Sequence, residues 1–197
     1  AVNNATRGGG LYDVSGEMVT IYALNGFGFS LNTNDASGDG GAAYLTTGTT
    51  LGIYGDVTVS TNEATSDGGA FYVDDATLLL DGTSSGGQPD LGGANRAING
   101  DGGVIYARNG ALIVLDNVSL GSVGAANSAG MDGGGIYADG STVILEDVRI
   151  FGNSAGDDGG GMALVNDSAL IMGTSYSDAT PECDPNTLAA NVYCSEI

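Results

Sequence analysis

Basic residues are almost absent from this chain. It has no lysine and no histidine, and its four arginines (Arg7, Arg96, Arg108 and Arg149) stand against 24 acidic residues, which gives a formal net charge of −20. A chain without a basic groove cannot neutralise a phosphate backbone, so nucleic acid and anionic lipid are poor partners. A Ser-His-Asp triad and its lysine variant are also excluded, because neither base is available.

Long apolar runs are missing too. The longest is Ala111-Leu112-Ile113-Val114-Leu115, far below the roughly 18 residues that cross a bilayer. We therefore expect no membrane insertion. The first residues lack the charged start and apolar stretch of a signal peptide, so we expect any such segment to have been removed or never included.

Cysteine is scarce, and its two copies, Cys183 and Cys194, both lie near the end of the sequence. A pair separated by ten residues fits a small disulfide loop in a secreted chain, and two unrelated free thiols are the alternative. The pair favours a secreted, extracellular or cell-surface location.

Glycine is abundant, at 36 of 197 residues, and it recurs in a pattern. Glycine pairs followed by an apolar residue return at intervals of roughly 30 residues, ending at Gly10, Gly41, Gly69, Gly103, Gly135 and Gly161. An Asn-x-Ala triplet precedes each pair, beginning at Asn3, Asn34, Asn62, Asn95, Asn127 and Asn153. A repeat of this length indicates stacked structural units.

Each repeat is expected to hold three short strands and no helix. One repeat contains Ala70–Val73 after its glycine pair, and others show the alternating stretch Thr142–Leu145 or the short Val57–Val59 before the next asparagine. Such units cannot bury a face alone, so each strand must pair in parallel with its counterpart one turn along. The sequence predicts an all-β fold: a parallel β-helix of about six turns over residues 1–172, then a non-repeating tail over 173–197.

The repeated residues have structural interpretations. Glycine supplies the positive φ angle of a sharp corner, for which the candidates are Gly41, Gly69, Gly103, Gly135 and Gly161. The asparagines form either an inward ladder, bonded side chain to side chain along the axis, or plain solvent-facing turns; the candidates are Asn34, Asn62, Asn127 and Asn153.

The glycine corners and asparagine lead-ins together carry a family resemblance. The segments Gly134-Gly135-Ile136-Tyr137 and Ile150-Phe151-Gly152-Asn153-Ser154-Ala155 resemble repeats of the chlamydial-type polymorphic outer membrane proteins and related bacterial right-handed β-helix surface proteins. That family alternates a Gly-Gly-Ala-Ile motif with a Phe-x-x-Asn motif, and here Leu31, Val59 and Ile150 take the phenylalanine position in three turns. The resemblance covers about residues 1–172. It implies a right-handed parallel β-helix with an exposed adhesin-like or structural role and no catalytic residues.

Aspartate has one regular placement, just before the glycine corner. The candidates are Asp39, Asp67, Asp101, Asp132, Asp157 and Asp158. Stacked turns would set these carboxylates about 5 Å apart, where like charges repel by ~1 kcal/mol even in a water-like dielectric. A bound Ca²⁺ would relieve this repulsion, with turn carbonyls completing its oxygen ligands. The alternative is that Asp simply favours turns before glycine and salt screens the repulsion.

Alternation along the strands predicts an exposed apolar strip. If the first residue after each glycine pair faces inward, the outward residues on the first strand are Tyr12, Phe71, Ile105 and Tyr137, and those on the second are Leu79, Ile113, Ile144 and Ile171. A strip of a few hundred Å² marks an interaction site on a soluble protein. We expect either the tail or a second copy of the chain to cover this strip. The alternative to self-association is that the chain is part of a longer solenoid.

These observations favour a secreted or cell-surface structural or adhesive module that associates with itself into an ordered assembly or filament. A host surface or glycan is a further candidate partner. A polysaccharide-binding or polysaccharide-cleaving β-helix is the second interpretation. We predict no catalytic residues, because the carboxylates fall mainly in turns and a surface of this charge repels anionic polymers.

Overall fold

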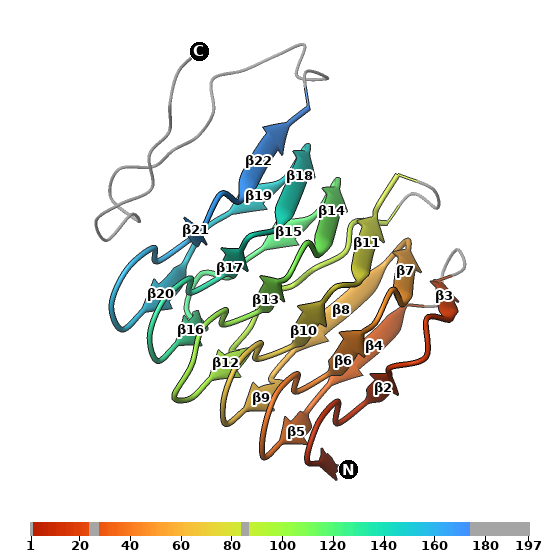
Figure 1. Cartoon of the computed structure of the whole chain (residues 1–197), viewed down its shortest axis with the longest axis horizontal. Coiled ribbons are helices and arrows are strands. Elements are labelled where there is room, and N and C mark those ends of the chain that lie inside the picture. The colour runs from red at the N-terminus through yellow and green to blue at the C-terminus, as the bar shows by residue number, and fades with distance from the viewer. Residues whose placement is uncertain (1, 24–27, 84–86, 174–197) are drawn as a thin grey trace.

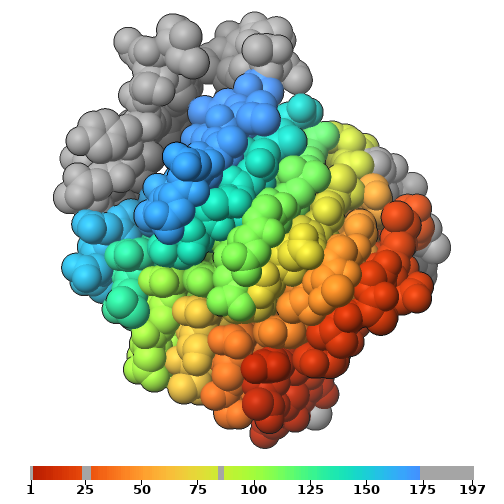
Figure 2. Space-filling model, viewed as in Figure 1, coloured from red at the N-terminus to blue at the C-terminus, as the bar shows by residue number. Residues whose placement is uncertain are grey.

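The chain folds into a parallel β-solenoid, as shown by a computed structural model that describes residues 2–23, 28–83 and 87–173 (Figure 1). Regular structure in these ranges consists of strands alone. Each of the six repeats adds one strand to each of three sheets, and these six layers complete about five turns rather than six. Successive turns lie side by side as parallel bands on the surface in Figure 2. Residues 174–197, which are most of the predicted tail and include Cys183 and Cys194, lie outside the described residues.

Three sheets of six parallel strands each form the walls of the solenoid. Sheet A, which carries the asparagines, consists of β1 (Asn3–Ala5), β5 (Asn34–Ala36), β9 (Glu63–Ala64), β12 (Arg96–Ala97), β16 (Asn127–Ala129) and β20 (Asn153–Ala155). Sheet B follows the glycine corners and consists of β2 (Leu11–Asp13), β6 (Ala43–Thr46), β10 (Phe71–Asp74), β13 (Ile105–Arg108), β17 (Ile136–Asp139) and β21 (Met162–Val165). Sheet C consists of β3 (Met18–Tyr22), β7 (Thr50–Tyr54), β11 (Thr77–Asp81), β14 (Leu112–Asp116), β18 (Thr142–Glu146) and β22 (Ala169–Met172).

A fourth wall, sheet D, is less regular. It contains the pairs β4 (Phe29–Asn32) with β8 (Val57–Ser60) and β15 (Ser119–Leu120) with β19 (Arg149–Ile150). Isolated parallel bridges through Asp90 link Thr58 to Ser119 and so join the two pairs. The neighbouring Leu91 is fully buried, so the third repeat still fills its share of the core.

The core fills the inside of the solenoid with residues from alternate strand positions. On sheet C these are Leu78 with Leu80, Ile113 with Leu115, and Val143 with Leu145. Aligned strands keep like residues in register, so each core side chain stacks on its counterpart one turn away.

The prediction that Ile113 faces outward is wrong. Ile113 pairs with Leu78 and Val143 and is fully buried, and Val114 instead pairs with the outward Leu79 and Ile144. The turn before β14 is one residue longer than the turn before β11, so Leu112 aligns with Thr77. Because side chains alternate with a period of two, a shift of one residue exchanges the two faces of the strand.

The prediction that Phe71 and Ile105 face outward is also wrong, since both are fully buried. The N–H groups of Ala70 and Phe71 both donate to the carbonyl oxygen of Val104, at 3.1 and 2.7 Å. Two consecutive donors on one acceptor make a bulge, which turns two successive side chains inward. Alternation therefore starts one residue later than we expected.

Candidate functional site

The interior beside sheet A holds a ladder of asparagines. From turn to turn each Nδ2 donates to the Oδ1 of the next asparagine at 2.8–3.0 Å, through Asn3, Asn34, Asn62, Asn95, Asn127 and Asn153. The Nδ2 of Asn95 also donates to the carbonyl oxygen of Val59, at 2.9 Å. Asn62, Asn95 and Asn127 are fully buried. The inward ladder is thus confirmed, and its side chains tie sheet A to the rest of each turn.

The glycine pairs make the corner between sheets A and B. Gly68 has a φ of +65°, which glycine adopts without strain, and Gly69 packs so closely on the next turn that an added Cβ would collide with the carbonyl oxygen of Gly103. Gly134 and Gly160 take the place of Gly69 in the later turns. The positive φ angles fall on Gly40, Gly68, Gly102, Gly133 and Gly159, so the prediction that the five candidate glycines supply them is wrong. Gly41, Gly69 and Gly103 are instead the close-packed residues that follow, whereas Gly135 and Gly161 stand one residue further on, at the position of Ala70.

Five of the six predicted metal-binding aspartates form a second ladder on the outside of this corner. The ladder starts at Asp39, and the backbone N–H of each later member, Asp67, Asp101, Asp132 and Asp158, donates to the Oδ1 of the aspartate one turn before, at 2.8–3.4 Å. Asp157 is exposed beside the ladder, and its own N–H donates to the carbonyl oxygen of Met131. These carboxylates therefore satisfy backbone donors. Among residues 2–23, 28–83 and 87–173 no three acidic or cysteine side chains gather as a group able to hold a metal ion.

The aspartate ladder is electrostatically unfavourable at neutral pH. Burial raises the pKa of Asp67; the N–H of Asp101 opposes this shift, and the carboxylates of Asp101 and Asp39 add to it. Burial likewise raises the pKa of Asp101, with the carboxylate of Asp132 adding to the shift. Both carboxyl groups therefore hold their protons more tightly in the folded chain than in the unfolded one.

A third ladder, which our interpretation of the sequence missed, runs along the outer face of sheet B. Five tyrosine rings stack with centroids 4.7–5.5 Å apart and nearly parallel planes: Tyr12, Tyr44, Tyr72, Tyr106 and Tyr137. Tyr12 and Tyr137 do face outward as predicted, and Tyr12 at the end of the stack is 54% exposed. The available signal was a tyrosine at the second strand position of five repeats.

Two arginines pack against the rings of the tyrosine ladder. The guanidinium of Arg7 lies 5.2 Å from the centroid of the Tyr44 ring, and that of Arg108 lies 5.3 Å from the centroid of Tyr72. Burial raises the pKa of Tyr72, and burial raises the pKa of Tyr106 to about 12. These hydroxyls therefore stay neutral at physiological pH, which makes the ladder a packing element.

The outer face of sheet C carries three lines of side chains along the solenoid axis. The middle line, which we call the aliphatic column, consists of Leu79, Val114, Ile144 and Ile171. All four are partly or wholly exposed, and Ile171 reaches 50%. The predicted strip therefore exists, with Val114 in place of Ile113.

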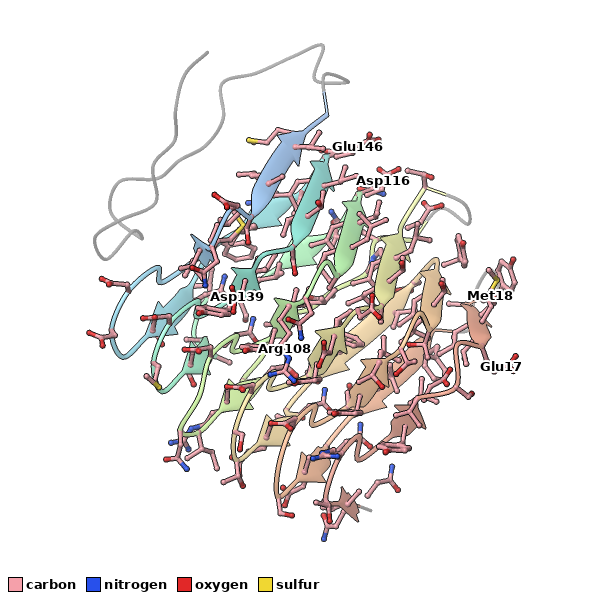
Figure 3. The ribbon with its side chains drawn as sticks, in the orientation of Figure 1. Glu17, Met18, Arg108, Asp116, Asp139 and Glu146 are labelled. Carbon is pink, nitrogen blue, oxygen red and sulfur yellow. The ribbon has the colours of Figure 1, made fainter. Side chains whose placement is uncertain are left out.

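The two flanking lines are polar. At one edge, the acidic row consists of Asp81, Asp116 and Glu146, which stand in register on β11, β14 and β18; Figure 3 shows Asp116 and Glu146 at adjacent strand ends. Burial, together with the carboxylates of Asp81 and Glu146, raises the pKa of Asp116. At the other edge lie Thr50, Thr77 and Thr142, the threonine row, with Leu112 between the last two.

A polar hollow of about 410 Å³ lies where sheet B turns into sheet C. It is lined by Thr46, Thr47, Asp74, Asp75 and Asn109 from three consecutive turns. Thr47, Asp75 and Asn109 each have a positive φ, between 51° and 59°, so the same left-handed turn recurs in every layer. The hollow is hydrophilic and open, unlike the apolar pockets that usually hold cofactors.

No helix within the described ranges is long and apolar enough to span a membrane. Among the described residues, the outer face of sheet C and the polar hollow are two surfaces that a partner or ligand can reach. The side chains of the three ladders instead bond or pack within the fold. Comparison with protein-family models, curated proteins and solved structures finds no match. The solenoid fold that the resemblance implies is present.

Proposed function

We propose that this chain is a structural or adhesive module of a secreted or cell-surface protein, without a catalytic role, that associates with a second copy of itself through the outer face of sheet C. The observation that carries this proposal is the aliphatic column. Four apolar side chains stand in register on four adjacent strands; three are partly exposed and Ile171 is half exposed. Contiguous exposed apolar surface of this kind marks interaction sites on soluble proteins.

The charge of the chain limits how two copies can meet. A two-fold axis along the strands would lay one acidic row against the other, and each carboxylate pair would cost ~1 kcal/mol even in a water-like dielectric. A two-fold axis parallel to the solenoid axis instead lays the acidic row over the partner's threonine row. Thr142 is the first residue of β18 and Glu146 is its last. This arrangement therefore brings the Thr142 hydroxyl toward the carboxylate of the partner's Glu146.

The area of the face sets the strength of the association. Six strands at ~4.8 Å spacing and five residues of ~3.3 Å make a face on the order of 450 Å² per copy. A stable complex usually buries about 800 Å² per partner. We therefore expect a weak dimer that forms when the module is concentrated, as it is when many copies are anchored side by side.

Sedimentation velocity over a range of protein concentrations tests this proposal. The unaltered chain is expected to show a reversible monomer–dimer equilibrium, and Ile144→Asp is expected to keep it monomeric because a charge then stands in the middle of the contact. Ser128→Asp is the matched control, since it adds the same charge to the outer face of sheet A. A chain that stays monomeric at every concentration, or a control that weakens the dimer equally, would overturn the proposal.

Calcium is a separate proposal that rests on the aspartate ladder alone. Its support is the row of carboxylates on adjacent turns, whose repulsion a divalent cation would relieve. Its test is the midpoint of thermal unfolding, measured with chelator and with added Ca²⁺ at matched ionic strength.

A further inference from the structure

We propose that the polar hollow between sheets B and C is a binding subsite for a neutral sugar residue of a glycan. The proposal goes beyond self-association, because the hollow lies in the turns after β6, β10 and β13, whereas the dimer contact uses the outward side chains of the sheet C strands. It gives the module a ligand of stated chemistry and a place where the ligand binds.

The hollow is held in shape by the groups behind it. The Oδ2 of Asp74 accepts hydrogen bonds from Nε and Nη2 of Arg108 at 2.8 and 2.7 Å, and its Oδ1 accepts one from Nδ2 of Asn109 at 2.7 Å. Arg108 is itself held over the ring of Tyr72 (Figure 3 labels Arg108 on the face of sheet B). The wall of the hollow is therefore preorganised and the charge of Asp74 is neutralised, which lowers the entropic cost of binding a ligand.

Three groups remain to contact a ligand. The carboxylate of Asp75 is exposed, and within the described residues no hydrogen bond or ion pair engages it. On the turn before, the Thr47 hydroxyl donates to the Thr46 hydroxyl at 3.3 Å, which leaves the Thr46 proton and the Thr47 oxygen for a ligand. Vicinal sugar hydroxyls can donate to a carboxylate in charge-assisted bonds and can exchange bonds with hydroxyl groups, so this set suits a polyhydroxylated ligand.

Size and charge narrow the ligand class further. A hollow of about 410 Å³ that opens to solvent and has a polar lining suits a small polar ligand that stays partly hydrated. The exposed Asp75 and the net charge of −20 repel uronic acids and sulfated sugars. A neutral sugar is favoured, and the openness of the site points to millimolar affinity, since its hydrogen bonds compete with water.

Asp75 has a positive φ, so it can be replaced by glycine without strain in the backbone. Asp75→Gly removes the carboxylate without backbone strain, because φ is +51° there and glycine adopts that angle freely. Asp147→Gly is the matched control: Asp147 is also exposed, has a φ of +50°, and lies in the turn after sheet C, away from the hollow.

Titration of ¹⁵N-labelled protein with maltose, cellobiose and lactose, followed by amide chemical shifts, tests the proposal. We expect saturable shifts at Thr47, Asp75 and Asn109 with at least one of these sugars, a loss of tenfold or more in affinity in Asp75→Gly, and no loss in Asp147→Gly. An absence of saturable shifts, equal losses in both variants, or tighter binding of a uronic acid disaccharide would overturn it. Saturable shifts with Ca²⁺ alone at the same amides, and none with sugar, would also overturn it and indicate a cation site. Sedimentation of Asp75→Gly should match the unaltered chain, so the two proposals fail independently.

Discussion

Replacing Asn95 by alanine tests the asparagine ladder at its centre. The change removes four hydrogen bonds. The Nδ2 of Asn95 donates to the Oδ1 of Asn127 and to the carbonyl oxygen of Val59. The Oδ1 of Asn95 accepts from the backbone N–H and from the Nδ2 of Asn62. At a net value of about 1 kcal/mol for each bond, the loss is ~4 kcal/mol. A loss of this size is a large part of the ~5–15 kcal/mol that stabilises a typical domain.

Position in the ladder provides an internal comparison. Asn3 makes a single side-chain bond, at 2.8 Å to Asn34, at the exposed end of the ladder, so Asn3→Ala should cost about 1 kcal/mol or less. Ser128→Ala on the outer face of sheet A should stay within ~0.5 kcal/mol of the unaltered chain.

Urea unfolding followed by circular dichroism gives the free energy of unfolding for each variant. The expected order of loss is Asn95→Ala far above Asn3→Ala, with Ser128→Ala near zero. If Asn95→Ala lost no more than Asn3→Ala, the buried ladder would not be a source of stability, and our explanation of the repeated asparagines would be refuted.

Three further predictions concern the corner between sheets A and B. Gly69→Ala should lower the thermal midpoint sharply, because the added Cβ collides with the carbonyl oxygen of Gly103. Gly28→Ala is the control and should change the midpoint little, because its Cβ would make ordinary contacts at 3.8 Å. Equal effects of the two variants would contradict this packing. The pKa values of Asp67 and Asp101 are raised in the folded chain, so protonation of these groups favours the folded state. The thermal midpoint should therefore rise as the pH falls from 7 toward the unfolded-state pKa of 3.8. Replacing both residues by asparagine should flatten this rise. Chelator should lower the midpoint and added Ca²⁺ should raise it; equal midpoints at matched ionic strength would remove calcium from the account.

The fold was predictable because the repeat makes the same physical demand in every turn. The Asn-x-Ala triplets and glycine pairs recur in order, and only stacked parallel strands satisfy them all at once. The same regularity left two interpretations of the asparagines open, and the structure shows the inward ladder. A buried amide needs partners, and the next turn offers an identical one. Asn62 and Asn95, which stand at the same position of successive repeats, therefore lie one above the other and bond side chain to side chain.

The faces of individual strands were less predictable, because a turn one residue longer or a bulge reverses the alternation. The longer turn before β14 exchanged Ile113 with Val114, and the bulge at Ala70 and Phe71 turned a large aromatic side chain inward. Alignment by the aspartate at each corner gives the right register in sheet B, where Phe71 pairs with Ile105 as Asp101 follows Asp67. It fails by one residue in sheet C, because the turn before β14 is longer and pairs Thr77 with Leu112.

The polar hollow was beyond prediction from the sequence. It depends on three turns meeting in space and on the ion pair between Asp74 and Arg108, residues that are 34 positions apart. The repeat pattern does not predict this ion pair, because the residue at this strand position varies from turn to turn: Thr46, Asp74, Arg108, Asp139 and Val165.

Intermolecular distances between spin labels test the central claim, that two copies meet through the outer face of sheet C, most directly. With Cys183 and Cys194 replaced by serine, a label attached through Val114→Cys would lie near the proposed two-fold axis, and one attached through Ser128→Cys would lie on the outer face of sheet A. At concentrations where sedimentation detects a dimer, we predict a short intermolecular distance for the label at position 114 and a clearly longer one for position 128. A short distance at position 128, or no intermolecular coupling at position 114, would contradict the account.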